Sequence, residues 1–129
     1  MPPRKVIIDT NFLLIPHKYK IDIFNELDYI IEIHHKYVLS TKTIKELEKI
    51  AENKGKTGAG AGLALKIIDA RKDKIEIIHS GMPVDEWIEK YAKETGAIVC
   101  TNDKALKNKL KESDIKVISL KGRKKLGFV

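Results

Sequence analysis

The sequence predicts a single α/β domain over residues 1–129, with helices on both faces of a central parallel sheet of about five strands. Three observations predict it. The length suits one domain. Five short apolar runs rich in β-branched residues recur along the chain, and longer stretches with helical spacing lie between them. Strands that alternate with helices form right-handed crossovers, which produces a three-layer sandwich.

The predicted strands are short and rich in isoleucine and valine. In order they cover residues 6–8, 37–39, 75–78, 97–100 and 115–118. The first and fourth are apolar at every position, which is typical of central strands buried on both faces. In such sheets ligands bind beyond the carboxyl ends of the strands, where the strand order reverses. We therefore look for functional residues at that edge.

Apolar residues spaced three and four apart predict four helices between the strands. Their apolar faces contain, in order, Ile44, Leu47, Ile50 and Ala51; Leu63, Ile67 and Ala70; Trp87, Ile88, Tyr91 and Ala92; and Leu106 and Leu110. The glycine-rich stretch 53–62 is expected to be a flexible loop, so that the second helix begins at Leu63. Basic residues from Lys121 onward predict a partly ordered tail, residues 121–129.

The composition indicates a soluble, cytoplasmic protein with a basic surface. The formal net charge of +7 is compatible with a polyanionic partner, although Lys and Glu enrichment also fits a source that grows at high temperature. A single cysteine, Cys100, excludes an internal disulfide and a cysteine-based zinc site. The apolar run near the N-terminus is too short for a signal peptide or a membrane span.

Acidic residues follow both fully apolar strands. Asp9 ends the first strand, and Asp103 lies in the Thr-Asn-Asp segment after the fourth. Glu46 and Asp85 stand near the starts of helices attached to the same sheet edge. These four acids are the candidate catalytic and metal-binding residues.

Three of the four acids also have a structural interpretation. Asp103 and Asp85 are candidate helix N-caps, and Glu46 stands three residues after Thr43, as in a capping box. Asp9 has no evident capping role, because no helix is predicted for several residues after it. A buried carboxylate at that position is costly without a cation or several hydrogen-bond donors. Asp9 is therefore the strongest functional candidate.

Together the acids and their neighbours resemble the motifs of the PIN-domain nucleases. Ile-Ile-Asp-Thr-Asn matches the family's segment at the end of the first strand, and Ile-Lys-Glu-Leu matches its glutamate helix. An aspartate opens the helix before the fourth strand, where Glu86 beside Asp85 is an alternative ligand. Thr-Asn-Asp-Lys-Ala-Leu matches the segment after that strand. The resemblance spans residues 6–118 and covers residues 7–11, 44–47, 84–88 and 101–106.

The resemblance implies a Rossmann-like PIN fold and a metal-dependent endoribonuclease that hydrolyses RNA. Two like charges about 4 Å apart repel by about 4 kcal/mol at an effective dielectric near 20, so four clustered carboxylates need a cation. Hard oxygen ligands favour Mg²⁺, with Mn²⁺ as an alternative. The cation would activate a water for attack on the phosphodiester. The residues expected to orient the carboxylates are Thr10, Asn11, Thr101 and Asn102.

The biological setting and partners stay open. The resemblance is compatible with a VapC-type toxin, which would have an antitoxin protein as partner, and with ribosomal RNA maturation. A non-catalytic RNA-binding or scaffold module is an alternative, but it would not need all four acids. A phospho-receiver domain would need an aspartate after the third strand, where His79-Ser80-Gly81 stands.

Other residues are candidates for RNA contact or for packing. The lysines of the glycine-rich stretch and the basic tail are candidate phosphate contacts, namely Lys54, Lys56, Arg123 and Lys124. The triplet at 55–57 resembles the end of a Walker A motif, but Ile50 stands where that motif needs glycine. Trp87 and Tyr91, four residues apart, are expected in the core or at a homodimer interface.

Overall fold

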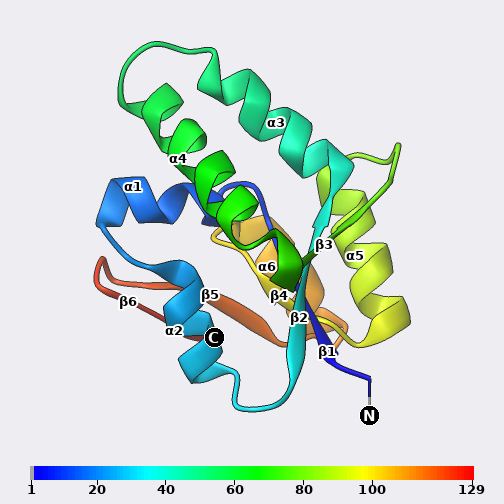
Figure 1. The fold of residues 1–129 in the computed structure, drawn as a ribbon. Helices are drawn as coiled ribbons and strands as arrows, with labels where there is room; N and C mark the ends of the chain where they lie inside the picture. Colours follow the sequence, from blue (N-terminus) through cyan, green and yellow to red (C-terminus); the bar gives the residue numbers. More distant parts are fainter. Residues whose placement is uncertain (1) are drawn as a thin grey trace.

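A computed structural model describes residues 2–129, and within that range a six-stranded sheet has helices on both faces (Figure 1). The strand order is β3-β2-β1-β4-β5-β6. The first five strands are parallel, and β6 pairs antiparallel with β5. The predicted α/β class is confirmed. The strands are β1 (Arg4–Ile8), β2 (His35–Ser40), β3 (Ile75–Ile78), β4 (Ile98–Cys100), β5 (Val117–Lys121) and β6 (Lys125–Phe128).

Successive side chains of the central strands point to opposite faces of the sheet, and this produces two apolar cores. Ile7, Val38 and Val99 face a core shared with α5 and α6, whereas Val6 and Ile8 face a core shared with α1, α2, α3 and α4. This is the expected three-layer arrangement. The helical segments are η1 (Phe12–Leu14), α1 (Ile15–Tyr19), α2 (Ile23–Ile30), α3 (Thr41–Ala51), α4 (Lys56–Ala70), η2 (Lys72–Lys74), α5 (Val84–Thr95) and α6 (Lys104–Glu112).

The strand order reverses between β1 and β4. The chain proceeds from β1 to β2 and β3 on one side, and then returns to place β4 on the other side of β1. Ile8 lies beside Cys100 in the β1–β4 register. The residues that follow these two strands, Asp9 and Thr101, therefore leave the sheet side by side at its carboxyl edge. That is the position where ligands bind in open α/β sheets.

The flexible loop predicted for residues 53–62 is wrong, because α4 begins at Lys56 and runs through three glycines. A Cβ atom on Gly58 would lie 1.8 Å from the carbonyl oxygen of Asn53, so only glycine fits this close approach to the end of α3. The pair α3–α4 packs as an antiparallel hairpin (Figure 1). Burial of Gly58, Gly60 and Ala61 on α4 outweighs the low helix propensity of glycine.

The partly ordered basic tail predicted for residues 121–129 is also wrong. Gly122 adopts a left-handed turn, with φ of 63°, and β6 then pairs with β5 along its length. Leu126 is buried in the core, and its N–H donates a hydrogen bond to Glu26 of α2 at 3.1 Å. The sheet therefore has an antiparallel edge strand that was not predicted.

The sequence patterns assigned no element to the segment between β1 and β2. In the structure, η1, α1 and α2 occupy it and cover one face of the sheet. Its fully buried side chains include Phe12, Phe24 and Leu27. None of the helices in residues 2–129 is both long and apolar enough to cross a membrane.

Candidate active site

Asp9 is held rigidly at the end of β1. Its side chain is 5% exposed. One carboxylate oxygen accepts a hydrogen bond from the Thr10 N–H at 2.8 Å, and the other accepts one from the Thr101 hydroxyl at 2.7 Å. The backbone is fixed as well, because the Asp9 N–H donates to the Cys100 carbonyl and the Asp9 carbonyl accepts from the Phe12 N–H. Contrary to expectation, a helical turn, η1, starts only three residues later.

Thr101 connects Asp9 to Asp103. Its hydroxyl donates to Asp9 and accepts a hydrogen bond from the Asp103 N–H at 3.0 Å. The Asp103 side chain accepts from the Leu106 N–H at 3.0 Å, so the N-cap interpretation of this residue is confirmed. The cap uses one carboxylate oxygen, Oδ1. Asp103 therefore fixes the start of α6 beside Asp9.

The asparagines of the two loops brace the same region. The side chain of Asn11 accepts a hydrogen bond from the Asn102 N–H at 3.1 Å, which ties the loop after β1 to the loop after β4. The side chain of Asn102 accepts from the Leu120 N–H at 3.0 Å, which ties that loop to β5. The structure thus places both residues where they orient the loops that carry the acids.

Glu46 is brought to Asp9 by α3. The hydroxyl of Thr10 donates a hydrogen bond to the Glu46 carboxylate. The capping-box interpretation of Glu46 is wrong, because Ser40 caps α3 by accepting from the Lys42 N–H, and Thr43 lies buried inside the helix. Glu46 itself is exposed, so it stands at the rim of the site.

Asp85 approaches from α5. Pro83 is the N-cap of this helix, so the N-cap interpretation of Asp85 is wrong. Burial and the nearby charges of Asp103 and Glu46 raise the pKa of Asp85 above its usual value. Asp85 is the α5 carboxylate whose charge acts on Asp9, and this favours it over Glu86 as the functional residue.

The four acids therefore meet at one edge, and we call Asp9, Glu46, Asp85 and Asp103 the acidic cluster. Burial raises the pKa of Asp9 to about 6, helped by the charges of Asp85 and Asp103, although hydrogen bonds from Thr101 and Thr10 oppose this. Asp9 is ionised at neutral pH despite these neighbours. In residues 2–129, no three acidic, histidine or cysteine side chains are arranged closely enough to hold a metal ion together.

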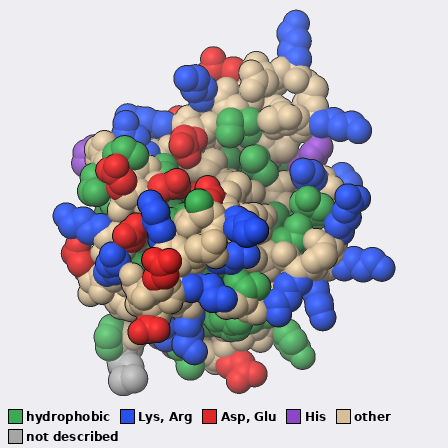
Figure 2. Space-filling view, turned by 180° about the vertical axis from the view of Figure 1, so that it is seen from behind, with side chains coloured by type: hydrophobic (Ala, Val, Ile, Leu, Met, Phe, Trp, Pro, Cys, Tyr) green, Lys and Arg blue, Asp and Glu red, His purple; other side chains and the backbone are tan. Residues whose placement is uncertain are grey.

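The candidate RNA contacts lie outside the acidic cluster. Lys54 and Lys56 are exposed at the junction of α3 and α4, and Arg123 and Lys124 are exposed in the turn between β5 and β6. On the face seen in Figure 2, Lys and Arg predominate along the right-hand margin, the side of α1 and the β5–β6 hairpin, whereas acids gather on the other half. Both predicted basic segments therefore belong to the surface.

Two further findings concern packing residues. Trp87 and Tyr91 stack at 5.0 Å, and Trp87 is buried against the sheet, so packing in the core is confirmed for it. Sequence reasoning missed Ser119 of β5, whose buried hydroxyl donates to the Thr101 carbonyl and supports the loop that carries Asp103. The sequence offers one indication of this role, which is that Ser119 is a polar residue between the apolar residues of a strand.

Comparisons with known proteins agree with this geometry. Residues 6–123 match a family model described as a PIN like domain. The ribonuclease VapC4 of Methanocaldococcus jannaschii is 35% identical over 124 residues, which cover 93% of this chain and 92% of that protein. The rRNA-processing protein fcf1 of Schizosaccharomyces pombe is 32% identical over 113 residues, which cover 86% of this chain and 55% of that protein.

A solved structure shows the same fold. The structure of the PIN domain endonuclease Utp24 aligns with a TM-score of 0.79 and 28% identity, covering 99% of this chain and 92% of that one. The sequence match, the shared fold and the acidic residues between β1 and β4, where the strand order reverses, all indicate the same family. This chain belongs to the PIN-domain family.

Proposed function

We propose that the protein is a metal-dependent endoribonuclease whose active site is the acidic cluster. The observation that carries this proposal is the meeting of four carboxylates from four separate segments at the β1–β4 switch point. The nuclease activities named for VapC4 and Utp24, and the rRNA processing named for fcf1, support RNA cleavage as the reaction.

The chemistry of the cluster fits a divalent cation. All four donors are carboxylates, which are the hard ligands that Mg²⁺ and Mn²⁺ prefer. Burial and mutual repulsion raise the pKa of Asp9 and Asp85, and a bound cation would relieve this repulsion. Asp9 and Asp103 would hold the ion from fixed positions, and the exposed side chains of Glu46 and Asp85 would rotate to complete the site.

A divalent cation bound there would lower the pKa of a bound water and offset the negative charge that develops on the phosphodiester. The chain's own residues supply the positioning. Thr101 and Thr10 fix both oxygens of Asp9, and Asn11 and Asn102 fix the loops. Because Glu46 and Asp85 are exposed, an RNA strand can reach the cluster from solvent.

The pKa of Asp9 is raised to about 6 in the metal-free protein, so protons compete with a cation for this carboxylate at acid pH. Above that pH the carboxylate is ionised and able to hold a cation, and below it a proton competes for the same oxygens. We therefore propose that metal-dependent cleavage declines at acid pH, and that a higher Mg²⁺ concentration moves this decline to lower pH.

Two cellular settings follow from the relatives. One is a toxin whose partner is an antitoxin protein, as the VapC name suggests, and the other is ribosomal RNA processing, as for fcf1. Expression of the chain alone separates them. A toxin arrests growth unless a cognate small protein is co-expressed, whereas a processing enzyme changes precursor rRNA levels without arrest.

The decisive test of the proposed reaction is cleavage of a panel of cellular RNAs across a Mg²⁺ titration. We expect cleavage that requires Mg²⁺, stops with a chelator, and is lost in Asp9→Asn. The chain's exposed carboxylate Asp69, outside the acidic cluster on α4, supplies the matched control, because Asp69→Asn should cleave normally. Equal cleavage by Asp9→Asn and the unaltered chain would contradict the proposal.

A further inference from the structure

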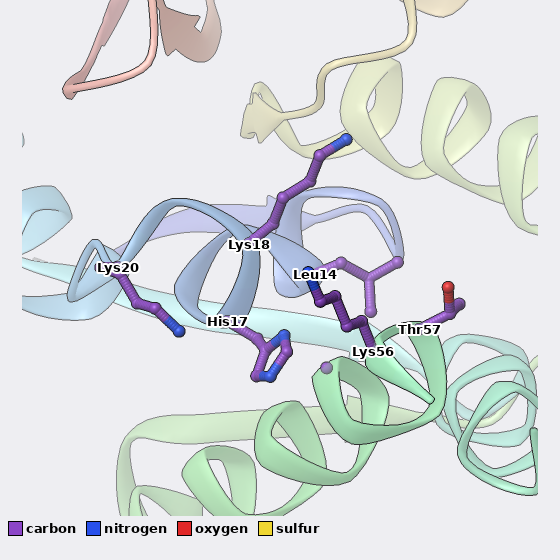
Figure 3. A pocket seen from close by; sticks show the side chains of 7 residues that line it. Leu14, His17, Lys18, Lys20, Lys56 and Thr57 are labelled. Carbon is purple, nitrogen blue, oxygen red and sulfur yellow. The ribbon is translucent and has the colours of Figure 1, made fainter. Parts of the chain in front are cut away.

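A basic pocket separates α1 from the first turns of α4. It has a volume of about 780 Å³ and is lined by Leu14, His17, Lys18, Lys20, Lys56, Thr57 and Gly60. Figure 3 shows Lys20 and His17 pointing into the gap between the two helices, with Lys56 reaching across from the start of α4. The lining contains cationic and neutral groups but no carboxylate. An anion is therefore the ligand that its charge favours.

The pocket lysines are free to bind such a ligand. None of the ion pairs found in residues 2–129 includes Lys18, Lys20 or Lys56. The ammonium of Lys18 lies 5.4 Å from the centre of the neighbouring Tyr19 ring and, in Figure 3, points away from α4, so it forms the rim. Lys20 and Lys56 are the charges directed at the interior.

The backbone of Lys20 supplies an independent reason to assign it a role. It ends α1 in the left-handed conformation, with φ of 58° and ψ of 42°, where glycine is the ordinary residue. Within residues 2–129, Asp114 is the only other residue besides glycine with positive φ. A lysine in this conformation strains the backbone, whereas glycine would not. Such strained positions are typical of functional sites, and here the lysine side chain supplies a charge that glycine would lack.

The pocket is adjacent to the acidic cluster along the chain. Leu14, at one end of its lining, is the last residue of η1, and η1 starts three residues after Asp9. The same turn packs against α4, and α4 packs against α3, which carries Glu46. The pocket and the acidic cluster therefore share η1 and the α3–α4 pair as packed neighbours.

We propose that this pocket binds a backbone phosphate of the RNA strand held at the acidic cluster, through Lys20, Lys56 and the imidazole of His17. This inference rests on the proposed function and names how the substrate is held. A phosphate accepts hydrogen bonds from ammonium and imidazole N–H groups together, and the Thr57 hydroxyl adds a further donor at the rim. The contact is independent of sequence, so it positions the strand and leaves base selection to other residues.

The test is binding of a fluorescently labelled 12-nucleotide single-stranded RNA, measured by anisotropy in chelator between 50 and 200 mM salt. For single strands each phosphate contact contributes about 0.7 to the slope of log affinity against log salt. The double variant Lys20→Gly with Lys56→Gln should lose about 0.7 of that slope, because both lysines hold the same phosphate. Over this fourfold salt range the unaltered chain should then lose roughly 2.6-fold more affinity than the variant.

Two controls separate charge from folding. The double variant Lys90→Gln with Lys111→Gln removes the same charge from exposed positions on α5 and α6, and it should keep the original slope. Lys20→Gly alone should unfold at the same or a higher urea concentration, since glycine relieves the left-handed strain, while it reduces the salt slope by up to about 0.7. A purely structural role for Lys20 would not produce that combination.

The outcomes distinguish this inference from the proposed function. A smaller salt slope in the pocket variant, with the original slope in the α5–α6 variant, supports the pocket whether or not the chain cleaves RNA. An unchanged slope in the pocket variant overturns the pocket, even if Mg²⁺-dependent cleavage is observed. The absence of any RNA binding by the unaltered chain in chelator overturns the pocket, whereas the proposed function fails only if the Mg²⁺ titration gives no cleavage.

Discussion

Replacement of Asp9 by asparagine should stabilise the metal-free protein while it removes the activity. Asp9 is 5% exposed, and its pKa rises from 3.8 to about 6 because its charge is buried beside Asp85 and Asp103. The folded protein therefore binds the proton more tightly than the unfolded chain does. Stability from this group is fully present below pH 3.8 and is lost as the pH rises to about 6.

The size of the effect follows from the two pKa values. A difference of about two pH units, at about 1.4 kcal/mol per unit, is about 3 kcal/mol of unfolding free energy lost at pH 7.5. Asparagine has no charge to bury, so this is the upper limit of the gain in Asp9→Asn. Thr101 and Thr10 both donate to the carboxylate, and their weaker bonds to an amide reduce the gain to roughly 1–3 kcal/mol.

Urea unfolding in chelator at pH 7.5 and at pH 4 measures this directly. We expect Asp9→Asn to be more stable at pH 7.5, and the difference to fall below about 1 kcal/mol at pH 4, where the carboxylate is mostly protonated in the folded state. Asp69→Asn, at an exposed site on α4, should change neither value. A variant that is less stable at pH 7.5, or a gain that does not depend on pH, would refute the reasoning.

Three further predictions test the supports of the site. Thr101→Val removes the hydroxyl shared by Asp9 and Asp103, so it should lower the unfolding free energy by about 1–3 kcal/mol and slow RNA cleavage; urea unfolding and initial rates measure both. Asp85→Asn should abolish cleavage under conditions in which Glu86→Gln retains it, and the reverse result would transfer the role to Glu86. Gly58→Ala should destabilise by about 2 kcal/mol or more because of the contact with Asn53, whereas Gly62→Ala, which has open space, should stabilise by up to about 1 kcal/mol; a thermal melt of both variants is the check.

The sequence predicted those parts of the fold that depend on local periodicity. The apolar runs at 6–8 and 97–100 required burial on both faces, and this placed Asp9 and Asp103 together at the switch point. The acidic edge between the first and fourth strands followed from that inference, whereas the order of the other strands was not predicted. Asp9 and Asp103 were therefore predictable because they stand just after strands whose position the pattern determines. Glu46 and Asp85 lie on helices, α3 and α5, and were selected because those helices begin or end at the same sheet edge.

The errors came from interactions between distant segments. The glycines of α4 read as a loop because their helix is stabilised by contact with α3 and α1, and helix propensity does not report such contacts. Strand β6 was missed because its four residues show too little apolar alternation to predict a strand. Its conformation depends on the contacts of Leu126 with α2 and on pairing with β5. The role of Ser119 likewise depends on a partner, Thr101, that lies 18 residues away.

The central claim is that the acidic cluster holds a divalent cation, and Mn²⁺ binding tests it most directly. Electron paramagnetic resonance reports free Mn²⁺ during a titration of the unaltered chain at pH 7.5, without RNA. We predict specific binding that Mg²⁺ competes away, that is lost in Asp9→Asn and in Asp103→Asn, and that persists in Asp69→Asn. Equal Mn²⁺ binding by all four proteins would contradict the account.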